Sequence, residues 1–374
     1  MRRFITHASA RDRVIQIALV LAVAGVLGFF WSNASENLAR RSITFGFGFL
    51  WQTAGFDIPF RILEWKVTDT YGRALWVSFL NTVLVSVLTI VTATLLGLAL
   101  GIMRLSGNWL VRNISLALIE LVRNTPQLIQ IVFWYVAVLR TLPGPRQSIE
   151  LATGVFLNIR GLFLPSFGLS VVGWSALWIA LAALVLLPFV WRRRVGRLPL
   201  APLLAAVPLA AAAVGYTAIE SVDLPRLQGF NFRGGVVVPP ELVALWAGLS
   251  IYAAAFIAEI VRGSIEGIGR GQYEAARAMA LTPSQTLMLI ILPQAIRIMI
   301  PPLTSQYLNL IKSSSLGAAI AYPELVQIFA GTVLNQSGRA IEVMTLVMVI
   351  FLIINLLMSA FMNWYNRKVA LVER

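Results

Sequence analysis

The sequence predicts an all-α membrane protein that crosses the bilayer several times. Of its 374 residues, 58% are hydrophobic and only 12% are charged, which is about half the charge of a typical soluble domain. The mean hydropathy is +0.80. The apolar residues are grouped in runs of about twenty, the length that a helix needs to cross the hydrocarbon core of a bilayer.

The charge distribution fits a membrane protein better than a nucleic-acid-binding protein. The formal net charge is +14, but arginines gather beside apolar runs, as in residues 191–197, and the cytoplasmic excess of Lys and Arg in membrane proteins explains this pattern. There is no cysteine, and the single histidine is His7. Disulfides, Cys ligands and a His-based catalytic pair inside the membrane are therefore excluded. We expect no metal site and no nucleic-acid partner.

We predict about eight transmembrane helices, one for each apolar run. They lie at about residues 14–31, 76–103, 126–142, 169–190, 198–219, 242–260, 297–311 and 343–361. Arginines that include Arg11 and Arg13 precede the first run and place the N-terminus in the cytoplasm. A cleaved signal peptide is the alternative, but no A-x-A-like cleavage site follows that run. An even number of spans returns the C-terminus to the cytoplasm as well.

A short helix is expected between the sixth and seventh spans, at residues 272–281. Glu274 lies near its start, where the positive end of the helix dipole favours an acid. Its alanines leave a slim surface that another protein can approach closely. Thr282, Pro283 and Gln285 then form the signature of a capping box that starts a new helix. We favour a docking helix for a partner over an ordinary loop.

Charged residues at the ends of two spans have the same spacing. Glu120 precedes Arg123 by three positions, and Glu259 precedes Arg262 by three. Charges at membrane depth are usually paired or functional. Ion pairs within each helix that fix the span ends are the favoured interpretation, and a gate in which the two spans exchange partners is the alternative.

The seventh span carries polar residues on one helical stripe. Gln306, Asn309 and Ser313 share a face, with Lys312 and Ser314 beside them. Amide and hydroxyl groups offer donors and acceptors to a zwitterion without a buried net charge. These residues are candidates for a substrate pathway, and interhelical hydrogen bonds are an equally open interpretation. For Lys312, reaching toward the membrane surface is favoured over binding a carboxylate.

Several motifs resemble those of polar amino-acid permeases of ABC importers. Residues 120–128 are similar to the E-x-x-R-x-x-P signature of that family, and residues 258–263, 271–276 and 312–316 resemble further motifs. Together they cover about residues 81–141 and 250–364. Residues 46–51, 54–58 and 361–367 are similar to the Q-type subunit of general L-amino-acid transporters, a subgroup that adds spans outside the core.

The resemblance implies a five-helix core of the type I ABC importer, extended by one N-terminal span and two inserted spans. We expect a single transmembrane domain over residues 1–374. Its parts are an N-terminal span and outer segment at 1–75, core spans at 76–142, an inserted loop with two spans at 143–239, and core spans at 240–374.

In that family the short helix with the Glu-Ala-Ala motif couples the permease to a separate ATPase. By resemblance, the coupling residues here are Tyr273, Glu274, Ala275, Ala276, Arg277, Ala280 and Leu281. The family has glycine where this chain has Ala280. Because alanine disfavours the left-handed turn that glycine allows, we expect a looser turn or a helix one residue longer.

The implied partners are an M-type permease subunit in a heterodimer, two copies of an ABC ATPase, and a periplasmic amino-acid-binding protein, with membrane lipids around the spans. The sequence has no G-x-x-x-x-G-K-[ST] motif. ATP and Mg²⁺ are therefore expected on the partner ATPase, with no cofactor in this chain.

We predict a permease subunit that carries L-amino acids, with broad specificity, across a bacterial inner membrane by alternating access. It is not itself expected to be an enzyme. The alternative is a secondary amino-acid carrier driven by an ion gradient, which the lack of carboxylates in mid-span disfavours. A receptor or scaffold is a third class, but no extramembrane domain supports it.

Overall fold

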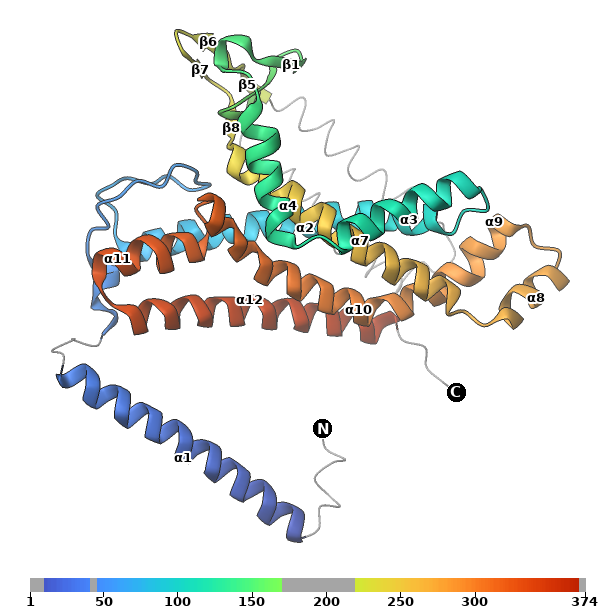
Figure 1. The fold of residues 1–374 in the computed structure, drawn as a ribbon, viewed down its shortest axis with the longest axis horizontal. Helices are drawn as coiled ribbons and strands as arrows, with labels where there is room; N and C mark the ends of the chain where they lie inside the picture. Colours follow the sequence, from blue (N-terminus) through green and yellow to red (C-terminus); the bar gives the residue numbers. More distant parts are fainter. Residues whose placement is uncertain (1–9, 41–45, 170–218, 370–374) are drawn as a thin grey trace. The chain divides into compact units, whose positions relative to one another are not determined.

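The computed structural model describes residues 10–40, 46–169 and 219–369, and most of them are helical (Figure 1). The α-helices are α1 (Ala10–Arg40), α2 (Tyr71–Arg104), α3 (Trp109–Arg123), α4 (Gln127–Val132), α7 (Pro240–Glu266), α8 (Arg270–Ala278), α9 (Pro283–Gln285), α10 (Leu292–Ser313), α11 (Leu334–Ser337) and α12 (Ala340–Val369). Shorter 3₁₀ and π segments are η1 (Phe47–Trp51), η2 (Phe133–Val138), η3 (Leu139–Thr141), η4 (Pro145–Gln147), η5 (Thr286–Ile291), η6 (Ser314–Ile320) and η7 (Val326–Val333).

Four helices among the described residues are long and apolar enough to cross a membrane. They are Tyr71–Arg104, Pro240–Glu266, Pro283–Ile320 and Ala340–Lys368, and they contain the second, sixth, seventh and eighth predicted spans. Shorter apolar helices, Val14–Phe30 and Gln127–Thr141, match the first and third. The fourth and fifth predicted spans fall almost wholly on residues 170–218, outside the described part of the chain. The count of eight stays a prediction.

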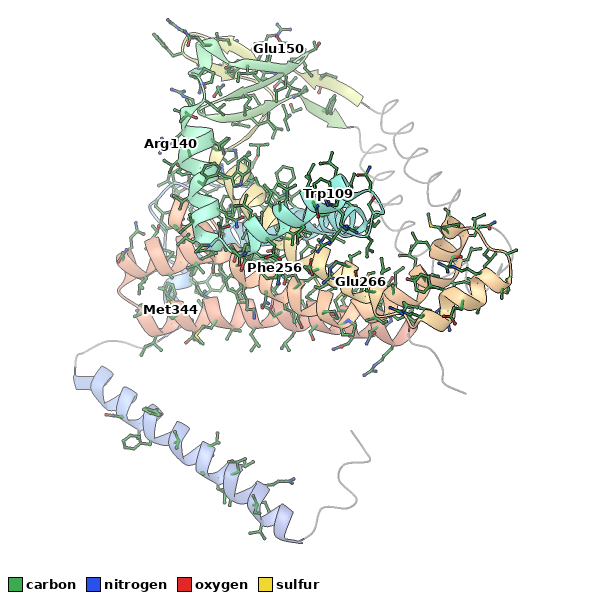
Figure 2. The ribbon with its side chains drawn as sticks, turned by 45° about the vertical axis from the view of Figure 1, so that its right-hand side comes forward. Trp109, Arg140, Glu150, Phe256, Glu266 and Met344 are labelled. Carbon is green, nitrogen blue, oxygen red and sulfur yellow. The ribbon has the colours of Figure 1, made fainter. Side chains whose placement is uncertain are left out.

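The chain is mostly helical, as the predicted all-α class requires, but it departs from that class in the short strands that lie on both sides of residues 170–218. They are β1 (Ile149–Ala152), β2 (Val155–Asn158), β3 (Gly161–Leu164), β4 (Ser166–Leu169), β5 (Ile219–Asp223), β6 (Arg226–Gln228), β7 (Asn231–Arg233) and β8 (Val236–Val238). The first three strands and β8 form one antiparallel sheet, β4 pairs with β5, and β6 pairs with β7. Figure 2 shows Glu150 on β1, beyond the segment that carries Arg140.

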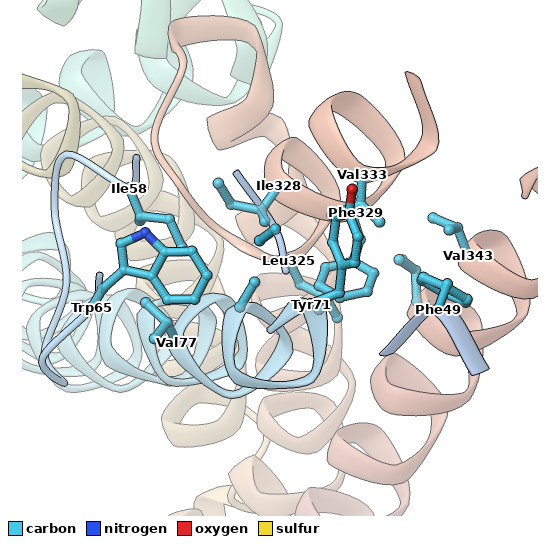
Figure 3. Close-up of a cluster of buried hydrophobic side chains, with 13 residues drawn as sticks. Phe49, Ile58, Trp65, Tyr71, Val77, Leu325, Ile328, Phe329, Val333 and Val343 are labelled. Atoms are coloured by element: carbon cyan, nitrogen blue, oxygen red, sulfur yellow. The ribbon is translucent and has the colours of Figure 1, made fainter. Parts of the chain in front are cut away.

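The chain divides into two compact units, Met1–Phe79 with Leu325–Ile353 and Leu80–Glu324 with Ile354–Arg374. The core of the first unit gathers Phe49 from η1, Trp65 from the following loop and Phe329 from η7 (Figure 3). The Trp65 indole N–H donates to the carbonyl of Phe56 over 3.1 Å. Burial of these large rings stabilises the irregular segment before α2. The single transmembrane domain expected over residues 1–374 stays a prediction.

A buried acid fixes the start of α12 in the same unit. Glu342 is only 2% exposed, and it accepts a hydrogen bond from the backbone N–H of Gly46 over 3.0 Å. It also pairs with Arg339 over 3.5 Å, and Arg339 donates to the carbonyl of Gly46. The charge is therefore buried with both a counter-ion and a hydrogen-bond donor, as a buried carboxylate requires.

In the second unit, α2 packs closely against α7 through two glycines four positions apart. A Cβ on Gly97 would lie 2.6 Å from the Cβ of Ile257, and one on Gly101 would lie 2.8 Å from the Cβ of Val261. Small residues at this spacing let two membrane helices approach each other until their backbones are nearly in contact. The Trp246 indole on α7 adds a hydrogen bond of 2.9 Å to the hydroxyl of Thr92 on α2.

Candidate functional site

The short helix α8 is attached to the two long helices on either side of it. The Tyr273 hydroxyl lies 3.5 Å from the carbonyl of Ile265 at the end of α7. Gln294 on α10 donates to the side chain of Gln272 over 3.2 Å. Ala276, three positions after Tyr273 on α8, is completely buried. These contacts fix the orientation of α8 with respect to α7 and α10.

The opposite face of α8 is open. Glu274, Ala275 and Arg277 are exposed, and among the described residues neither charged side chain forms an ion pair. The structure therefore brings five of the predicted coupling residues together on α8, with Tyr273 and Ala276 turned to the protein and Glu274, Ala275 and Arg277 to the outside. The other two, Ala280 and Leu281, lie in the turn that follows the helix. Such an exposed patch between two apolar helices is available to a partner protein.

The turn after α8 is tight, and the expectation of a looser turn or a longer helix is wrong. The helix ends at Ala278, and Ala280 adopts a positive φ of 54°. The N–H of Leu281 donates to the carbonyl of Ala276 and that of Ala280 to the carbonyl of Arg277. This pair of bonds defines a Schellman motif. The hydrogen bonds hold alanine in the conformation that glycine adopts more easily.

The predicted capping box after this turn is confirmed. The Thr282 hydroxyl accepts from the backbone N–H of Gln285 over 3.3 Å, and the Gln285 amide oxygen accepts from the N–H of Thr282 over 3.0 Å. The next residues form the π segment η5 before Pro293, which lacks the N–H that a regular α-helix would need there. Local chemistry therefore fixes both ends of the link from α8 to α10.

A polar cavity of about 320 Å³ lies between α4, α7 and α10. Its walls include three of the predicted stripe residues, Gln306, Asn309 and Ser313, and also Lys312. The Ser313 hydroxyl donates to the amide oxygen of Gln127, the first residue of α4, over 3.1 Å. We call this space the polar cavity.

The polar cavity combines aromatic rings with positive charge. Tyr252 and Phe256, one turn apart on α7, line it with ring centres 4.9 Å from each other. The guanidinium of Arg123 lies 5.4 Å from the ring centre of Phe256 (labelled in Figure 2). None of the described residues that line the cavity is acidic. The cavity can therefore offer a cation and amide donors to a carboxylate, and ring faces to an ammonium group.

The structure separates Ser314 from the other candidates. Its side chain is buried, and its hydroxyl donates to the carbonyl of Ile311 near the end of α10 over 2.7 Å. Sequence reasoning missed four residues of the cavity lining, Gln127, Tyr252, Phe256 and Leu310. Gln127 directly follows Pro126 of the signature motif, and the two rings have the i, i+4 spacing of one helix face, so both signals were present in the sequence.

The charged pairs at the span ends are formed within each helix. Arg123 lies 3.7 Å from Glu120 on α3, and Arg262 lies 2.8 Å from Glu259 on α7. Arg262 also bonds to Glu266. Within the described part of the chain, no ion pair joins α3 to α7. This arrangement agrees with the favoured interpretation as local pairs, and the exchange of partners in a gate stays a prediction.

Apolar spanning helices, a polar cavity and an exposed short helix define a class, the membrane-embedded permeases. Comparison with known proteins identifies the family. The protein-family model described as binding-protein-dependent transport system inner membrane component matches residues 235–371. The chain is 47% identical to the putative amino-acid ABC transporter permease protein YhdX of Escherichia coli (strain K12), over 98% of this chain and 96% of that protein.

A second relative is similar over the same extent. The chain is 43% identical to the general L-amino acid transport system permease protein AapQ of Rhizobium johnstonii, over 95% of this chain and 92% of that protein. A chain from a crystal structure of an amino acid ABC transporter with histidines shares the fold, with a TM-score of 0.50, 18% identity, and coverage of 80% and 95% of the two chains. The chain belongs to the family of amino-acid ABC transporter permeases. These relatives give no support to an ion-gradient carrier.

Proposed function

We propose that this permease carries L-amino acids of several kinds through the polar cavity, by alternating access across a bacterial inner membrane. The observation that carries the proposal is the lining of the cavity by Gln127, Gln306, Asn309 and Ser313 beside Lys312, with no acid among the described lining residues. A zwitterion loses its hydration when it enters a membrane protein, so it needs this set of polar partners. The general L-amino acid system of a relative supports broad specificity.

Lys312 is well placed to attract the substrate carboxylate. It lines the polar cavity on α10, and it forms no ion pair within the residues that the structure describes. Its charge is therefore available to an anionic group. The rings of Tyr252 and Phe256 lie in the same wall region and would accept the ammonium group through cation–π attraction. Side-chain variety is then tolerated, because recognition falls on the groups that all amino acids share.

We further propose that α8 docks in a cleft of the partner ATPase. The Schellman turn at Ala280 and the capping box at Thr282 make α8 a rigid link to α10. Movement of the ATPase on binding ATP would then shift α7 and α10 together and change the side from which the cavity is open. ATP and Mg²⁺ are held by the ATPase, of which the complex contains two copies.

The remaining partners in the proposal are an M-type permease and a periplasmic amino-acid-binding protein. The names of the relatives support an ABC transporter as the setting. With the predicted even number of spans, both termini lie in the cytoplasm, and so does α8. The Arg104 end of α2 and the first residue of α10 then also face the cytoplasm.

Reconstitution of the complete transporter tests this function. Uptake of an amino acid into proteoliposomes should require both ATP and the binding protein. Glu274→Arg should abolish ATP-driven uptake while the complex still assembles, because the reversal places a like charge at the docked surface. Glu64→Arg is the matched control, since Glu64 is an exposed acid of the other unit. Uptake by the isolated chain in an ion gradient, or wild-type uptake by the Glu274 variant, would overturn the proposal.

A further inference from the structure

The polar cavity carries a positive charge that its described lining does not balance. Lys312 contributes its ammonium group, and the other described lining residues are amides, a hydroxyl, a leucine and two aromatic rings. Lys312 forms no ion pair with any part of the chain that the structure describes. An amino acid that enters the cavity therefore meets a cation whose charge is uncompensated, and the net charge of that amino acid decides whether the two attract or repel each other.

A second cation lies beside the aromatic wall of the cavity. The guanidinium group of Arg123 on α3 lies 5.4 Å from the ring centre of Phe256, the residue labelled in Figure 2. Glu120 lies 3.7 Å from Arg123 and offsets part of its charge. The rings can attract one ammonium group, but a further cation on the substrate would be repelled by both Arg123 and Lys312.

The acids of α3 and α7 that are closest in sequence to the cavity residues are already paired. Glu259 lies three positions after Phe256, and its carboxylate is 2.8 Å from the guanidinium of Arg262. Arg123 also lies within electrostatic range of this carboxylate. Glu120 is paired with Arg123. Neither acid lines the cavity, so neither is free to bind a cationic side chain of the substrate.

The amide groups of the cavity can donate hydrogen bonds to the substrate. The amide oxygen of Gln127 accepts from the Ser313 hydroxyl over 3.1 Å, which leaves its NH₂ group without a bond to another described residue. Gln306 and Asn309 line the same space and add further amide N–H donors. With the α-carboxylate drawn to Lys312, these donors can bind a second carboxylate or a carboxamide oxygen on the substrate side chain.

The other cavity of the same unit gives a charged side chain no alternative. It also has a volume of about 320 Å³, lies between α2, α7, α10 and α12, and is lined mostly by apolar residues such as Leu98, Ile300 and Leu303. We call it the apolar groove. A charged group without polar partners is costly to bury there, so the selection of charge falls to the polar cavity.

We propose that the polar cavity selects amino acids by the charge of their side chain, binding anionic side chains best, uncharged ones less well and cationic ones poorly. Glutamate neutralises the charge of Lys312, a neutral amino acid leaves it unbalanced, and arginine adds a second positive charge. Two like charges about 8 Å apart in a partly buried site lower the affinity roughly tenfold or more.

This inference rests on the proposed function, because it takes the polar cavity as the substrate path. It also makes that function more specific. Side chains of different shape are tolerated, since the cavity recognises the α-carboxylate and the ammonium group, but side chains of different charge are not equivalent in it.

Isothermal titration calorimetry tests the proposal on the purified membrane complex of both permeases and the ATPase. The soluble binding protein makes its own selection, so it is left out and amino acids are added directly. Two pairs of amino acids have nearly the same shape and differ in charge, glutamate with glutamine and arginine with citrulline. We expect glutamate to bind more tightly than glutamine, and citrulline to bind roughly tenfold more tightly than arginine.

Variants of Lys312 test the source of the selection. Lys312→Gln should move both ratios of Kd toward one, although each amino acid will bind more weakly because the α-carboxylate loses its partner. Lys312→Glu should reverse the order of arginine and citrulline. Each ratio is measured on a single preparation, so it does not depend on how much of the protein has folded. Lys66→Gln, at an exposed lysine of the other unit, is the matched control and should leave both ratios unchanged.

Variants outside the lining separate charge from direct contact. Glu120→Gln leaves the charge of Arg123 uncompensated, so it should increase the preference for citrulline over arginine. Arg123→Gln should decrease the same preference, and by less than Lys312→Gln does, because Arg123 does not line the cavity. Opposite shifts in these two variants support selection by charge, and shifts in the same direction would contradict it.

Two failures can be told apart. Equal affinities for arginine and citrulline in the wild-type complex, or ratios in Lys312→Gln equal to those of the wild-type, would overturn the selection by charge and leave the polar cavity as the path. If no amino acid binds to the complex, the proposed function of the cavity fails, and the selection by charge fails with it.

Discussion

Two faces of the same helix line cavities of similar volume and opposite chemistry. On α10, Asn309 and Ser313 face a cavity of about 320 Å³ that is rich in amides and hydroxyls, while Ile300 and Leu303 face an apolar groove of about 320 Å³. Size alone therefore says nothing about which space a zwitterion can enter. The lining decides it, because charged groups without polar partners cost several kcal/mol in an apolar space.

The difference follows from the spacing of side chains on the helix. Residues three, four and seven positions apart share a face, so one helix can present a polar stripe and an apolar stripe at the same depth. The polar stripe of α10 is held by a bond from Ser313 to Gln127. The apolar side is held by close helix packing at Gly97 and by the Thr94–Tyr307 hydrogen bond. Substitutions on the two sides should therefore affect different properties.

The largest effect is expected when the polar face is made apolar. Asn309→Leu should lower ATP-driven uptake by the reconstituted transporter by about tenfold to a hundredfold, because a hydrogen bond to a charged group contributes roughly 1.5–3 kcal/mol. Thr304→Val is the control on the same helix, since the Thr304 hydroxyl bonds to the carbonyl of Ile300 and lines neither cavity. Equal losses in both variants would contradict the role of the polar face.

Close packing on the apolar side gives the next largest effect, this time on stability. Gly97→Ala should destabilise the protein by about 1–3 kcal/mol, because the new methyl group would lie 2.9 Å from the carbonyl oxygen of Ala254, which belongs to the backbone and cannot rotate away. Thermal unfolding of the purified complex measures it. Gly263→Ala in α7 has open space around it and should be neutral or slightly stabilising.

A smaller change on the apolar side should leave transport intact. Tyr307→Phe removes the hydrogen bond to Thr94 and should cost about 1 kcal/mol of stability. Thr94→Val also removes the hydrogen bond from the Thr94 hydroxyl to the carbonyl of Ile90, so it should cost more than Tyr307→Phe. The double variant should cost little more than Thr94→Val alone, because both changes remove the Thr94–Tyr307 bond. Uptake per assembled complex should equal that of the wild-type. A loss of uptake as large as that of Asn309→Leu would show that the apolar face also belongs to the substrate path.

The smallest effect concerns the turn that links α8 to α10. Ala280→Gly should stabilise the protein by about 0.5–1 kcal/mol, since glycine adopts a positive φ without strain but loses more freedom on folding. Met279→Gly, at a position next to it whose φ is −85°, should destabilise instead. Chemical or thermal unfolding separates the two. A destabilising Ala280→Gly would mean that the turn is not under strain.

Local signals in the sequence predicted much of this arrangement. The capping box at Thr282 and the polar stripe at Asn309 depend on residues within two turns of each other, and both patterns agree with the structure. The apolar runs also predicted the described spanning helices. Where the deciding contacts are local, composition and periodicity are sufficient.

Other features depend on contacts that the sequence does not display. Strand β3 pairs with β8 more than seventy residues later, at Leu162 and Val238, and strands this short show too little alternation to be seen. Ala280 keeps its positive φ because its N–H donates to the carbonyl of Arg277 and the N–H of Leu281 donates to the carbonyl of Ala276, and these bonds overcome the preference of alanine for negative φ. The groove between α2 and α10 became visible only once the register of the two helices was known.

The most direct test of the two faces uses single cysteines, because the chain has none of its own. Asn309→Cys and Leu303→Cys would each be placed in a complete transporter whose other subunits also lack cysteine, and treated with a water-soluble thiol reagent in the presence and absence of an amino-acid substrate. The thiol of Asn309→Cys should react and should be protected by the substrate, while that of Leu303→Cys should stay unreacted. Substrate protection at Leu303→Cys instead, or equal reaction of both thiols without protection, would contradict the assignment of the substrate path to the polar face of α10.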